Sequence, residues 1–337
     1  MLIDVVIATY RRPEKVAALV TQLLACLHPS STIIVVDSSD EINSAFMDQH
    51  RVKYIRSTHK NQPYQRYVGY LISSADLLLY LDDDMEIIDS NLILPLFAPF
   101  ETETDLAGIA FHFTDKHVHS SLSKMPNSIF FSQKQQYKKI INWFTGYKIP
   151  ATGKLGLCGI RGPQPKEGGI TEWLSGGAFA AQKKYLFKNF NFQLLDLFEE
   201  KMGMGEDAII GYGLSKQGKL IYNPNLLFYH NDQADSTYST NTFHFSKRII
   251  FSRLFLSLEK TRLDGENYFR AWMHYYWYTG WRLMGMLGNY LCRPNMQRKE
   301  ILTGTWIGCK MASHFTFDVA LSRTQYWMNE AKKNIEC

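Results

Sequence analysis

The chain has 337 residues, of which 45% are hydrophobic and 20% are charged. This composition excludes a fibrous or disordered protein and predicts one large globular domain, or a domain with an appendage. The net charge of +5 is uneven: residues 115–167 hold nine Lys and Arg against two Asp and Glu, and residues 246–337 hold 14 against seven. We interpret these segments as solvated basic surface or as contacts for an anionic partner, and no motif predicts nucleic-acid binding.

The five cysteines are widely spaced and form no CxxC pair, so neither a disulfide framework nor a zinc site is predicted. The first residues run directly into an apolar segment and lack the basic start and cleavage site of a signal peptide. Both observations favour a cytoplasmic protein, with the cytoplasmic face of the membrane as a peripheral location.

Short apolar runs alternate with helical patterns in the first hundred residues, which predicts an α/β fold with parallel strands joined by crossover helices. A strand at residues 2–8 is followed by a helix that opens at Pro13. We expect the next elements in this order: strands at 32–36 and 52–55, a helix at 63–73, and a strand at 77–81.

Regular periodicity is lost after about residue 112, and glycines and prolines punctuate residues 153–169. We expect a mobile loop at about 115–170, of the kind that often covers an active site. A helix is expected after Asp207, a strand at 226–229 and helices from about 242 to the end. The predicted organisation is a catalytic domain at 1–245, with a nucleotide-binding half at 1–110 and an acceptor half at 111–245, and a C-terminal helical region at 246–337.

Three adjacent carboxylates, Asp82, Asp83 and Asp84, follow the apolar strand at 77–81. Adjacent carboxylates repel one another and are costly unless a cation neutralises them. Asp82 and Asp84 suit a hard divalent ion that keeps open positions for diphosphate oxygens. A solvated acidic turn is the alternative, and the buried strand before the triplet and a helix expected after it argue against that alternative.

Several motifs, taken in order, resemble the inverting glycosyltransferases of family 2, which have the GT-A fold, a Rossmann-like domain that binds nucleotide sugars. The resemblance covers roughly residues 1–235 and rests on VVIATYRRPEKV, VVDSSD, QRYVGYLISSADLLLYLDDD, WLSGGAF, GEDAIIGYGL and LFYHND. Each motif alone is weak, but their order and spacing are specific. The resemblance implies transfer of a sugar from a nucleoside diphosphate, most simply UDP, to a hydroxyl of a glycan or lipid-linked glycan in cell-surface polysaccharide synthesis.

The resemblance also implies that donor-binding residues follow the first strands. Thr9 and Arg11 would contact the nucleotide, with Arg11 standing where the family often has Asn. Asp37 would accept a hydrogen bond from the base or ribose, and Arg66 would face the phosphates. Asp83 would bind the ribose. The ordinary alternatives are a helix start for Thr9, a surface turn for Asp37 and a surface helix position for Arg66.

For the metal, the resemblance implies that Asp84 is the direct ligand and Asp82 supports it, while His230 supplies an imidazole to the same ion. A purely structural histidine is the alternative for His230. A mixed oxygen and imidazole set favours Mn²⁺ over Mg²⁺.

For the acceptor, the resemblance implies that Asp207 is the general base, with Glu206 as the alternative base or an acceptor-binding partner. A helix cap is the alternative role for Asp207. A wall that faces the sugars would be formed by Trp173, Ser175, Gly176 and Gly177, because glycine lets the backbone approach a sugar and tryptophan offers a flat apolar face. A core position is the alternative for Trp173.

Residues 271–291 contain seven Trp and Tyr and one formal charge, Arg282. The segment is long enough to cross a bilayer, but its polar aromatic groups and the central Arg282 and His274 favour a position in the membrane interface. On a helix, Trp277, Trp281, Met284 and Leu291 share one face, and the segment is flanked by Arg270, Arg293, Arg298 and Lys299. A buried helix that packs on the catalytic domain, or on a second copy in a homo-oligomer, is the alternative.

Two rival functions fit parts of the sequence. A sugar nucleotidyltransferase also uses an α/β domain and acidic metal ligands, but such enzymes favour a glycine-rich first loop, and ATYRRPEKV contains no glycine. A catalytically silent glycan-binding scaffold is disfavoured by the presence of Asp84 and Asp207.

Overall fold

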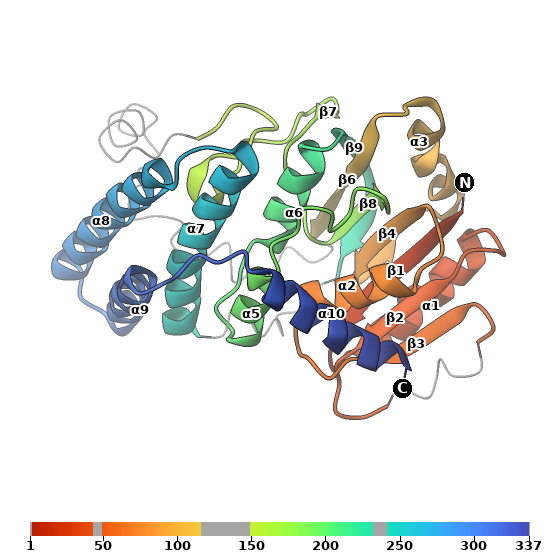
Figure 1. Ribbon diagram of the computed structural model, residues 1–337, viewed down its shortest axis with the longest axis horizontal. Helices are drawn as coiled ribbons and strands as arrows, with labels where there is room; N and C mark the ends of the chain where they lie inside the picture. Colours follow the sequence, from red (N-terminus) through yellow and green to blue (C-terminus); the bar gives the residue numbers. More distant parts are fainter. Residues whose placement is uncertain (1, 43–48, 116–148, 232–240, 337) are drawn as a thin grey trace.

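The computed structural model describes residues 2–42, 49–115, 149–231 and 241–336 (Figure 1). Its centre is a mixed sheet with the strand order β3-β2-β1-β4-β8-β6-β9-β5, and β7 pairs with β9 at its side. The strands are β1 (Ile3–Thr9), β2 (Ile33–Asp37), β3 (Val52–Arg56), β4 (Leu77–Asp82), β5 (Met85–Ile87), β6 (Leu106–Asp115), β7 (Gly169–Ile170), β8 (Ala178–Gln182) and β9 (Lys219–His230).

Helices cover the sheet and form the C-terminal part of the molecule (Figure 1). They are α1 (Pro13–Cys26), α2 (Gln62–Ile72), α3 (Pro99–Thr102), α5 (Gln193–Glu199), α6 (Glu206–Ser215), α7 (Thr242–Asp264), α8 (Tyr268–Cys292), α9 (Met296–Ser313) and α10 (Leu321–Glu336), with 3₁₀ turns η2 (Ser90–Leu92), η3 (Leu94–Phe97) and η5 (Leu157–Gly159).

The elements predicted in the first hundred residues are confirmed to within one residue at each end. One prediction is wrong: the short strand β5, not a helix, follows the acidic triplet. Met85 and Ile87 are buried at alternate positions, and β5 pairs antiparallel with the end of β9. The strand predicted at 226–229 is the end of the longer β9.

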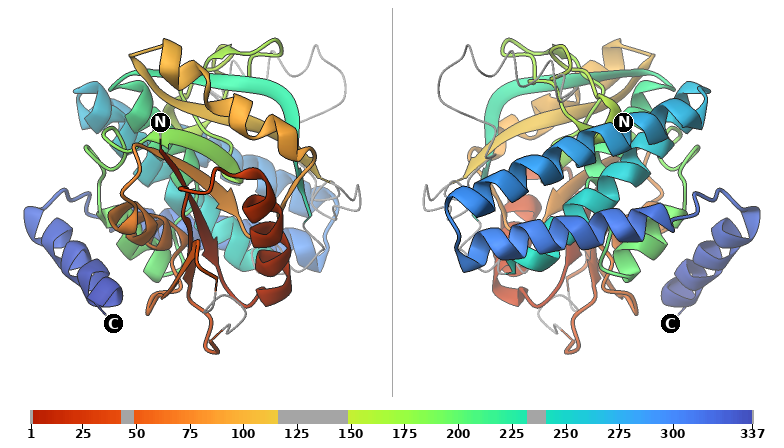
Figure 2. Two further views of the ribbon diagram at one scale, coloured as in Figure 1. Left: turned by 90° about the vertical axis from the view of Figure 1, so that its right-hand side faces the viewer. Right: turned by 90° about the vertical axis from the view of Figure 1, so that its left-hand side faces the viewer.

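The two faces of the sheet are covered by α1 and α2 (Figure 2, left). The apolar face of α1 buries Val16, Leu19 and Leu23 against β1 and β2. The opposite helix α2 lies very close to β1, because a Cβ atom at Gly69 would stand only 2.3 Å from Val6 Cγ1. Close packing on both faces fixes the carboxyl ends of β1, β2 and β4 at one edge of the sheet.

Helices α7, α8 and α9 pack together beside the sheet, and a separate core joins them to α6 and η5 (Figure 2, right). Helix α10 then returns to α2 in the first half of the chain, where Asn334 Nδ2 donates to the hydroxyl of Tyr64 at 2.7 Å. Trp327 Nε1 donates to Asp196 of α5 at 2.7 Å. The domain boundary at 245 stays a prediction, and these contacts tie the last helix to the first half of the chain.

Within the described residues, no helix is both long and apolar enough to cross a bilayer. Cys26, Cys158, Cys292 and Cys309 are free thiols. Much of the loop expected at 115–170 lies outside the described residues. Its described end, from residue 149, makes backbone hydrogen bonds such as Gly153 N to Pro163 O at 2.7 Å.

Candidate active site

The acidic triplet lies at the carboxyl end of β4, beside the ends of β1 and β2. In the parallel register, Asp82 is paired with Ala8, and Thr9 is paired with Asp37. The hydroxyl of Thr9 donates to Asp83 Oδ2 at 2.8 Å. We call Asp82, Asp83 and Asp84, together with Arg12, Arg66 and His230, the acidic cluster.

Arg12, which the sequence did not single out, neutralises part of this cluster. Its Nη1 atom lies 2.8 Å from Asp83 Oδ1 and 2.6 Å from Asp84 Oδ2. The preceding residue, Arg11, has a φ of 55°, in the left-handed region that few non-glycine residues adopt. This turn sends the exposed Arg11 side chain to Asp40, outside the acidic cluster, and lets Arg12 reach the carboxylates.

Arg66 connects the acidic cluster to the start of α6. Its guanidinium is buried, and Nη2 donates to Asp82 Oδ1 and to the carbonyl of Gly176, both at 2.8 Å. Nη1 lies 3.4 Å from Glu206 Oε1. Gln62 Nε2 also donates to Asp82 Oδ1 at 2.8 Å. One buried cation therefore gathers three sequence-predicted site segments that are far apart in the chain.

The carboxyl groups around Arg12 and Arg66 differ in the direction of their pKa shifts. Burial raises the pKa of Asp83 to about 6, although Arg12 opposes the shift. Burial and the neighbouring charge of Asp207 raise the pKa of Glu206 to about 7. Burial also disfavours the charged form of Asp84, but His230 and Arg12 outweigh it and the net effect lowers its pKa. Asp84 is therefore the carboxylate of the triplet best suited to stay ionised at neutral pH.

The geometry around His230 fits a divalent metal ion. His230 Nδ1 lies 3.0 Å from Asp115 Oδ1, and this contact favours the tautomer with its proton on Nδ1. Nε2 faces Asp84 Oδ1, 3.3 Å away, and a proton carried there gives the imidazolium that lowers the pKa of Asp84. Two acceptor atoms at that distance repel unless a proton or a cation lies between them. Adjacent ligands about 2.1 Å from an octahedral ion are about 3 Å apart, which matches this pair.

In the described part of the chain, no group of three or more His, Cys, Asp or Glu side chains converges as a complete metal site. Among the described residues, Asp84 and His230 are a facing pair whose atoms could serve as ligands. Other positions on an ion held there would remain for oxygens of water or a bound ligand.

Asp207, at the start of α6, pairs with an arginine from outside the acidic cluster. Arg161 Nη2 donates to Asp207 Oδ1 at 2.7 Å, and the same guanidinium lies 5.1 Å above the ring of Trp173. Asp207 Oδ2 is only 3.2 Å from where a Cβ atom at Gly176 would stand. We call Asp207, Arg161, Trp173 and Gly176 the helix-start cluster.

The other predicted residues also lie near these clusters or support them. The hydroxyl of Ser175 donates to the carbonyl of Phe111 at 2.9 Å, which fixes the WLSGG turn. A Cβ atom at Gly177 would stand 2.0 Å from Met85 Cε, so a larger residue there would displace the end of the Met85 side chain. Asp37 is buried and accepts from the hydroxyl of Tyr54 at 2.8 Å and from Ser39 N at 2.8 Å.

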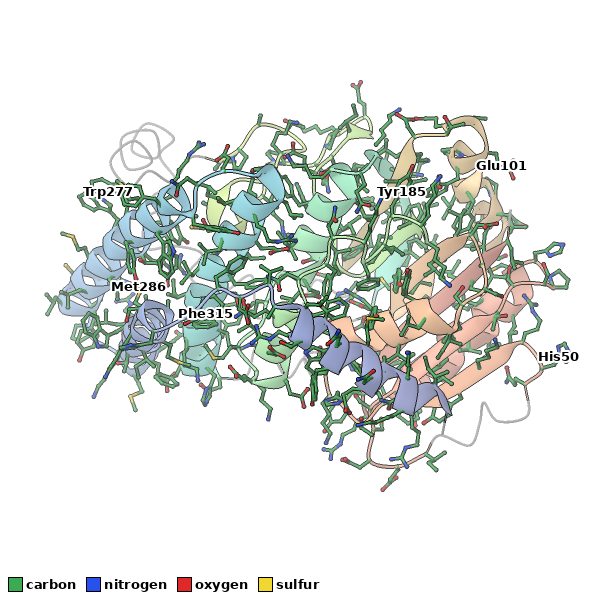
Figure 3. All side chains as sticks on the ribbon, in the orientation of Figure 1. His50, Glu101, Tyr185, Trp277, Met286 and Phe315 are labelled. Carbon is green, nitrogen blue, oxygen red and sulfur yellow. The ribbon has the colours of Figure 1, made fainter. Side chains whose placement is uncertain are left out.

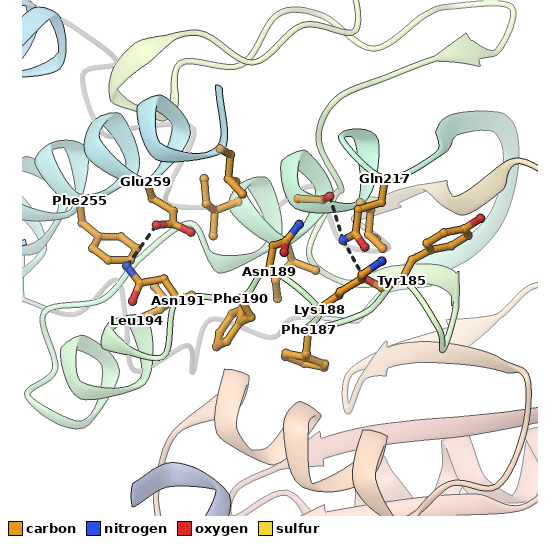
Figure 4. Close-up of a pocket in the computed structure, with 15 residues that line it drawn as sticks. Tyr185, Phe187, Lys188, Asn189, Phe190, Asn191, Leu194, Gln217, Phe255 and Glu259 are labelled. Carbon is orange, nitrogen blue, oxygen red and sulfur yellow. Dashed lines mark hydrogen bonds between the residues drawn. The ribbon is translucent and has the colours of Figure 1, made fainter. Parts of the chain in front are cut away.

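A further pocket lies on the other side of α6, between α6, α7 and residues 185–194 (Figure 4). Its polar side chains largely pair with the protein. Asn191 Nδ2 donates to Glu259 Oε2 at 3.1 Å, and Gln217 Nε2 donates to the carbonyl of Tyr185 at 3.0 Å. Glu259 also binds Arg262. We therefore place the candidate site at the two clusters and not in this pocket.

Residues 4–151 match the model of Glycosyl transferase family 2. The match covers 148 of the 337 residues and includes the acidic triplet, so it assigns this segment to glycosyltransferase family 2. The enzyme is thus a glycosyltransferase, and its α/β sheet with a helical C-terminal region is the GT-A fold expected from the sequence. The match favours a glycosyltransferase over the rival nucleotidyltransferase.

Among solved structures, S. aureus TarS 1-349 is similar with a TM-score of 0.46 and 12% identity, over 95% of both chains. The mannosyltransferase PcManGT from Pyrobaculum calidifontis, in complex with GDP-Man and Mn²⁺, has a TM-score of 0.46 and 10% identity, over 99% of this chain and 86% of that one. No curated protein matches the chain.

Sequence reasoning missed Arg12, Arg161 and Asp115. Arg12 stands next to the predicted Arg11, and the distinction depends on the left-handed turn between them. Asp115 meets His230 because β6 and β9 pair in parallel with these two residues in register. Arg161 lies in a loop without periodicity, and no local signal marks it.

Proposed function

We propose that this family 2 enzyme is a metal-dependent, inverting glycosyltransferase that moves a sugar from a nucleoside diphosphate, UDP first, to a hydroxyl of a glycan or lipid-linked glycan. The observation that carries the proposal is the buried Arg66 guanidinium, which lies within hydrogen-bond distance of Asp82 and of the carbonyl of Gly176. Arg66 holds the acidic cluster, where the donor nucleotide would bind, beside the start of α6, where Asp207 would act on the acceptor. Transfer of a sugar between two substrates requires two such groups close together.

In the proposed enzyme, Asp84 and His230 hold a divalent ion, and Asp82 supports it from its bonds with Arg66 and Gln62. When bound, the ion neutralises charge on the diphosphate of the donor. A carboxylate and an imidazole together favour Mn²⁺ over Mg²⁺. Asp115 keeps the imidazole of His230 oriented through the contact at Nδ1.

Donor binding would use the edge formed by β1, β2 and β4. Asp37 lies where it can accept from the base or ribose, and Thr9 and Asp83 are already linked at the adjacent position. Arg12 would bind the diphosphate of the donor, because its guanidinium already lies at Asp83 and Asp84. Arg11 would contact the nucleotide only from the outer rim.

Asp207 is the proposed general base. Arg161 holds Oδ1, so Oδ2, beside Gly176, is the atom that would take the proton of the acceptor hydroxyl. The acceptor oxygen then forms a bond to the anomeric carbon while the bond from that carbon to the diphosphate breaks, and the diphosphate leaves with the electron pair. Trp173 would form the wall for the sugars, and Glu206 would remain on the side of Arg66.

The cellular setting is part of the proposal. The free thiols of the described cysteines support a reducing compartment, the cytoplasm. Synthesis of a cell-surface polysaccharide on a lipid-linked acceptor would place the enzyme at the cytoplasmic face of the membrane, and a homo-oligomer remains compatible with this role.

A ligand screen tests the proposal. Purified enzyme is melted with UDP-, dTDP-, GDP- and CMP-sugars, each with Mn²⁺ and with a chelator, because a bound ligand raises the melting temperature. We expect one nucleotide to raise the melting temperature only when metal is present, and the same sugar nucleotide to be consumed when acceptor glycans are added. No metal-dependent shift with any of them would contradict the proposal.

A further inference from the structure

Helix α8 lies at the end of the molecule farthest from the sheet (Figure 1). It exposes a stripe of apolar side chains. At helical spacing along its length, the exposed side chains are Phe269, Met273, Tyr276, Trp277, Met284, Leu287 and Leu291. Trp277 is 54% exposed and Met284 is 63% exposed. Trp281, expected on the same face, is half-buried. Figure 3 shows Trp277 at the outer edge of the molecule, whereas Met286 lies inside.

The opposite face of α8 is fully used by the protein. Tyr275 and Ala271 are buried in the core shared with α7. Met286 Sδ accepts from the hydroxyl of Thr305 of α9 at 3.1 Å. Because one face of α8 packs on α7 and α9, the apolar stripe is the outer surface of a packed helix.

The charge around the stripe is positive. Helix α8 contains no Asp or Glu, and residues 268–313 hold six Lys and Arg against one acidic residue, Glu300. Arg270 lies beside Phe269 with 69% of its side chain exposed and pairs with Glu266 at 2.9 Å, whereas Arg293 and Lys299 are exposed at the turn to α9. Two copies that met through this face would bring like charges together, whereas an anionic surface would complement them.

The stripe is also connected to the helix-start cluster. His274 Nδ1, on the inner side of α8, lies 3.5 Å from Cys158 Sγ in η5. Arg253 Nη1 of α7 donates to the carbonyl of Cys158 at 2.6 Å. Arg161, which binds Asp207, follows only three residues later. The loop that holds the proposed base in place therefore packs directly on α8.

We propose that the apolar stripe of α8 docks on an anionic lipid bilayer, with its Trp, Tyr, Phe, Met and Leu side chains in the interface and the neighbouring Arg and Lys over the headgroups. This contact places the Arg161 loop directly behind the docked helix, on which η5 packs. Only the benefit for a lipid-linked acceptor rests on the proposed function; the docking itself does not.

The test is co-flotation of the full chain with phosphatidylcholine vesicles, with and without phosphatidylglycerol. Wild type is expected to float only with the anionic vesicles and to be released by salt. The double variant Trp277→Glu with Met284→Glu should bind them at least about tenfold more weakly, because it removes apolar burial. The matched control is Leu94→Glu, which changes an exposed apolar residue in the first half of the chain and should bind like wild type.

Melting temperature and metal-dependent donor binding are measured on the same samples. Both should stay at the wild-type level in the double variant, so a failure of docking is distinguished from a failure of the proposed function. Wild type that ignores anionic vesicles, or a double variant that floats as well as wild type, would overturn the inference. A wild-type dimer in light scattering that the double variant turns into a monomer, without vesicle binding, would assign the stripe to a second copy instead.

Discussion

The acidic cluster and the helix-start cluster are neighbours, yet they use charge in opposite ways. In the acidic cluster, three adjacent carboxylates are neutralised by several groups: Arg12 and Arg66 pair with Asp83 and Asp82, and His230 lies beside Asp84. In the helix-start cluster, a single carboxylate, Asp207, has a single arginine. The first arrangement suits a polyanion and its metal, and the second suits one proton. The boundary between the two clusters falls between Glu206 and Asp207, because Glu206 pairs with Arg66 and Asp207 pairs with Arg161.

Replacing Asp207 by Asn should give the largest loss. The amide oxygen can still accept from Arg161, so the fold is kept, but the base is gone and kcat should fall by roughly 10² to 10⁴. Single-turnover kinetics with saturating donor measures this fall. Glu206→Gln is the matched control and should keep kcat within about tenfold. Equal losses of kcat in the two variants would contradict the assignment of different roles to Asp207 and Glu206.

Replacing Asp84 by Ala should mainly damage donor binding. It removes the carboxylate that faces both His230 and Arg12, and kcat/KM should fall by about 10²-fold, chiefly through KM for the metal-bound donor. Initial rates over a range of donor and Mn²⁺ concentrations measure it. Asp40→Ala, which removes the exposed partner of Arg11 and Lys60, should behave like wild type. An Asp84→Ala enzyme with unchanged metal dependence would refute the ligand assignment.

Replacing Asp115 by Asn should have a smaller effect in the same direction. The variant loses the charged partner of His230 Nδ1, and the concentration of Mn²⁺ for half-maximal rate should rise by about 10-fold. A metal activation curve at fixed donor measures it. An Asp115→Asn enzyme with an unchanged activation curve, when Asp84→Ala shifts the curve, would contradict the role assigned to Asp115.

The smallest effect concerns stability. The pKa of Glu206 is raised to about 7 from an ordinary 4.5, so the folded state binds a proton that the unfolded state releases, and the free energy of unfolding falls as pH rises from 4.5 through 7. Glu206→Gln should remove a fall on the order of 3 kcal/mol and leave the part due to Asp83. Urea unfolding at several pH values measures it, and parallel pH curves for both proteins would contradict the assignment.

The elements that sequence predicted best are those whose signal is local. Apolar strands such as β1 and the helix that starts at Pro13 carry their pattern within a few residues, so their bounds were predicted closely. The three-residue β5 is too short for a pattern, and it exists only because β9 pairs with it. The acidic triplet and the start of α6 were predicted as site segments, and the structure brings them together through Arg66.

The missed residues depend on geometry that no single segment contains. Arg12 reaches the acidic cluster because Arg11 takes a left-handed turn, and Asp115 meets His230 because of the register between β6 and β9. Arg161 reaches Asp207 across 46 positions of sequence from a loop without periodicity. Such contacts follow from tertiary packing, so residue patterns alone did not predict them.

The division of labour between the two clusters is tested most directly by calorimetric titration of the Mn²⁺ complex of the nucleoside diphosphate that the ligand screen identifies. Wild type, Asp207→Asn and Asp84→Ala are titrated side by side. We predict that Asp207→Asn binds it within about threefold of wild type, while Asp84→Ala binds it at least about tenfold more weakly. Equal affinities in the two variants, whether both kept or both lost, would contradict the account.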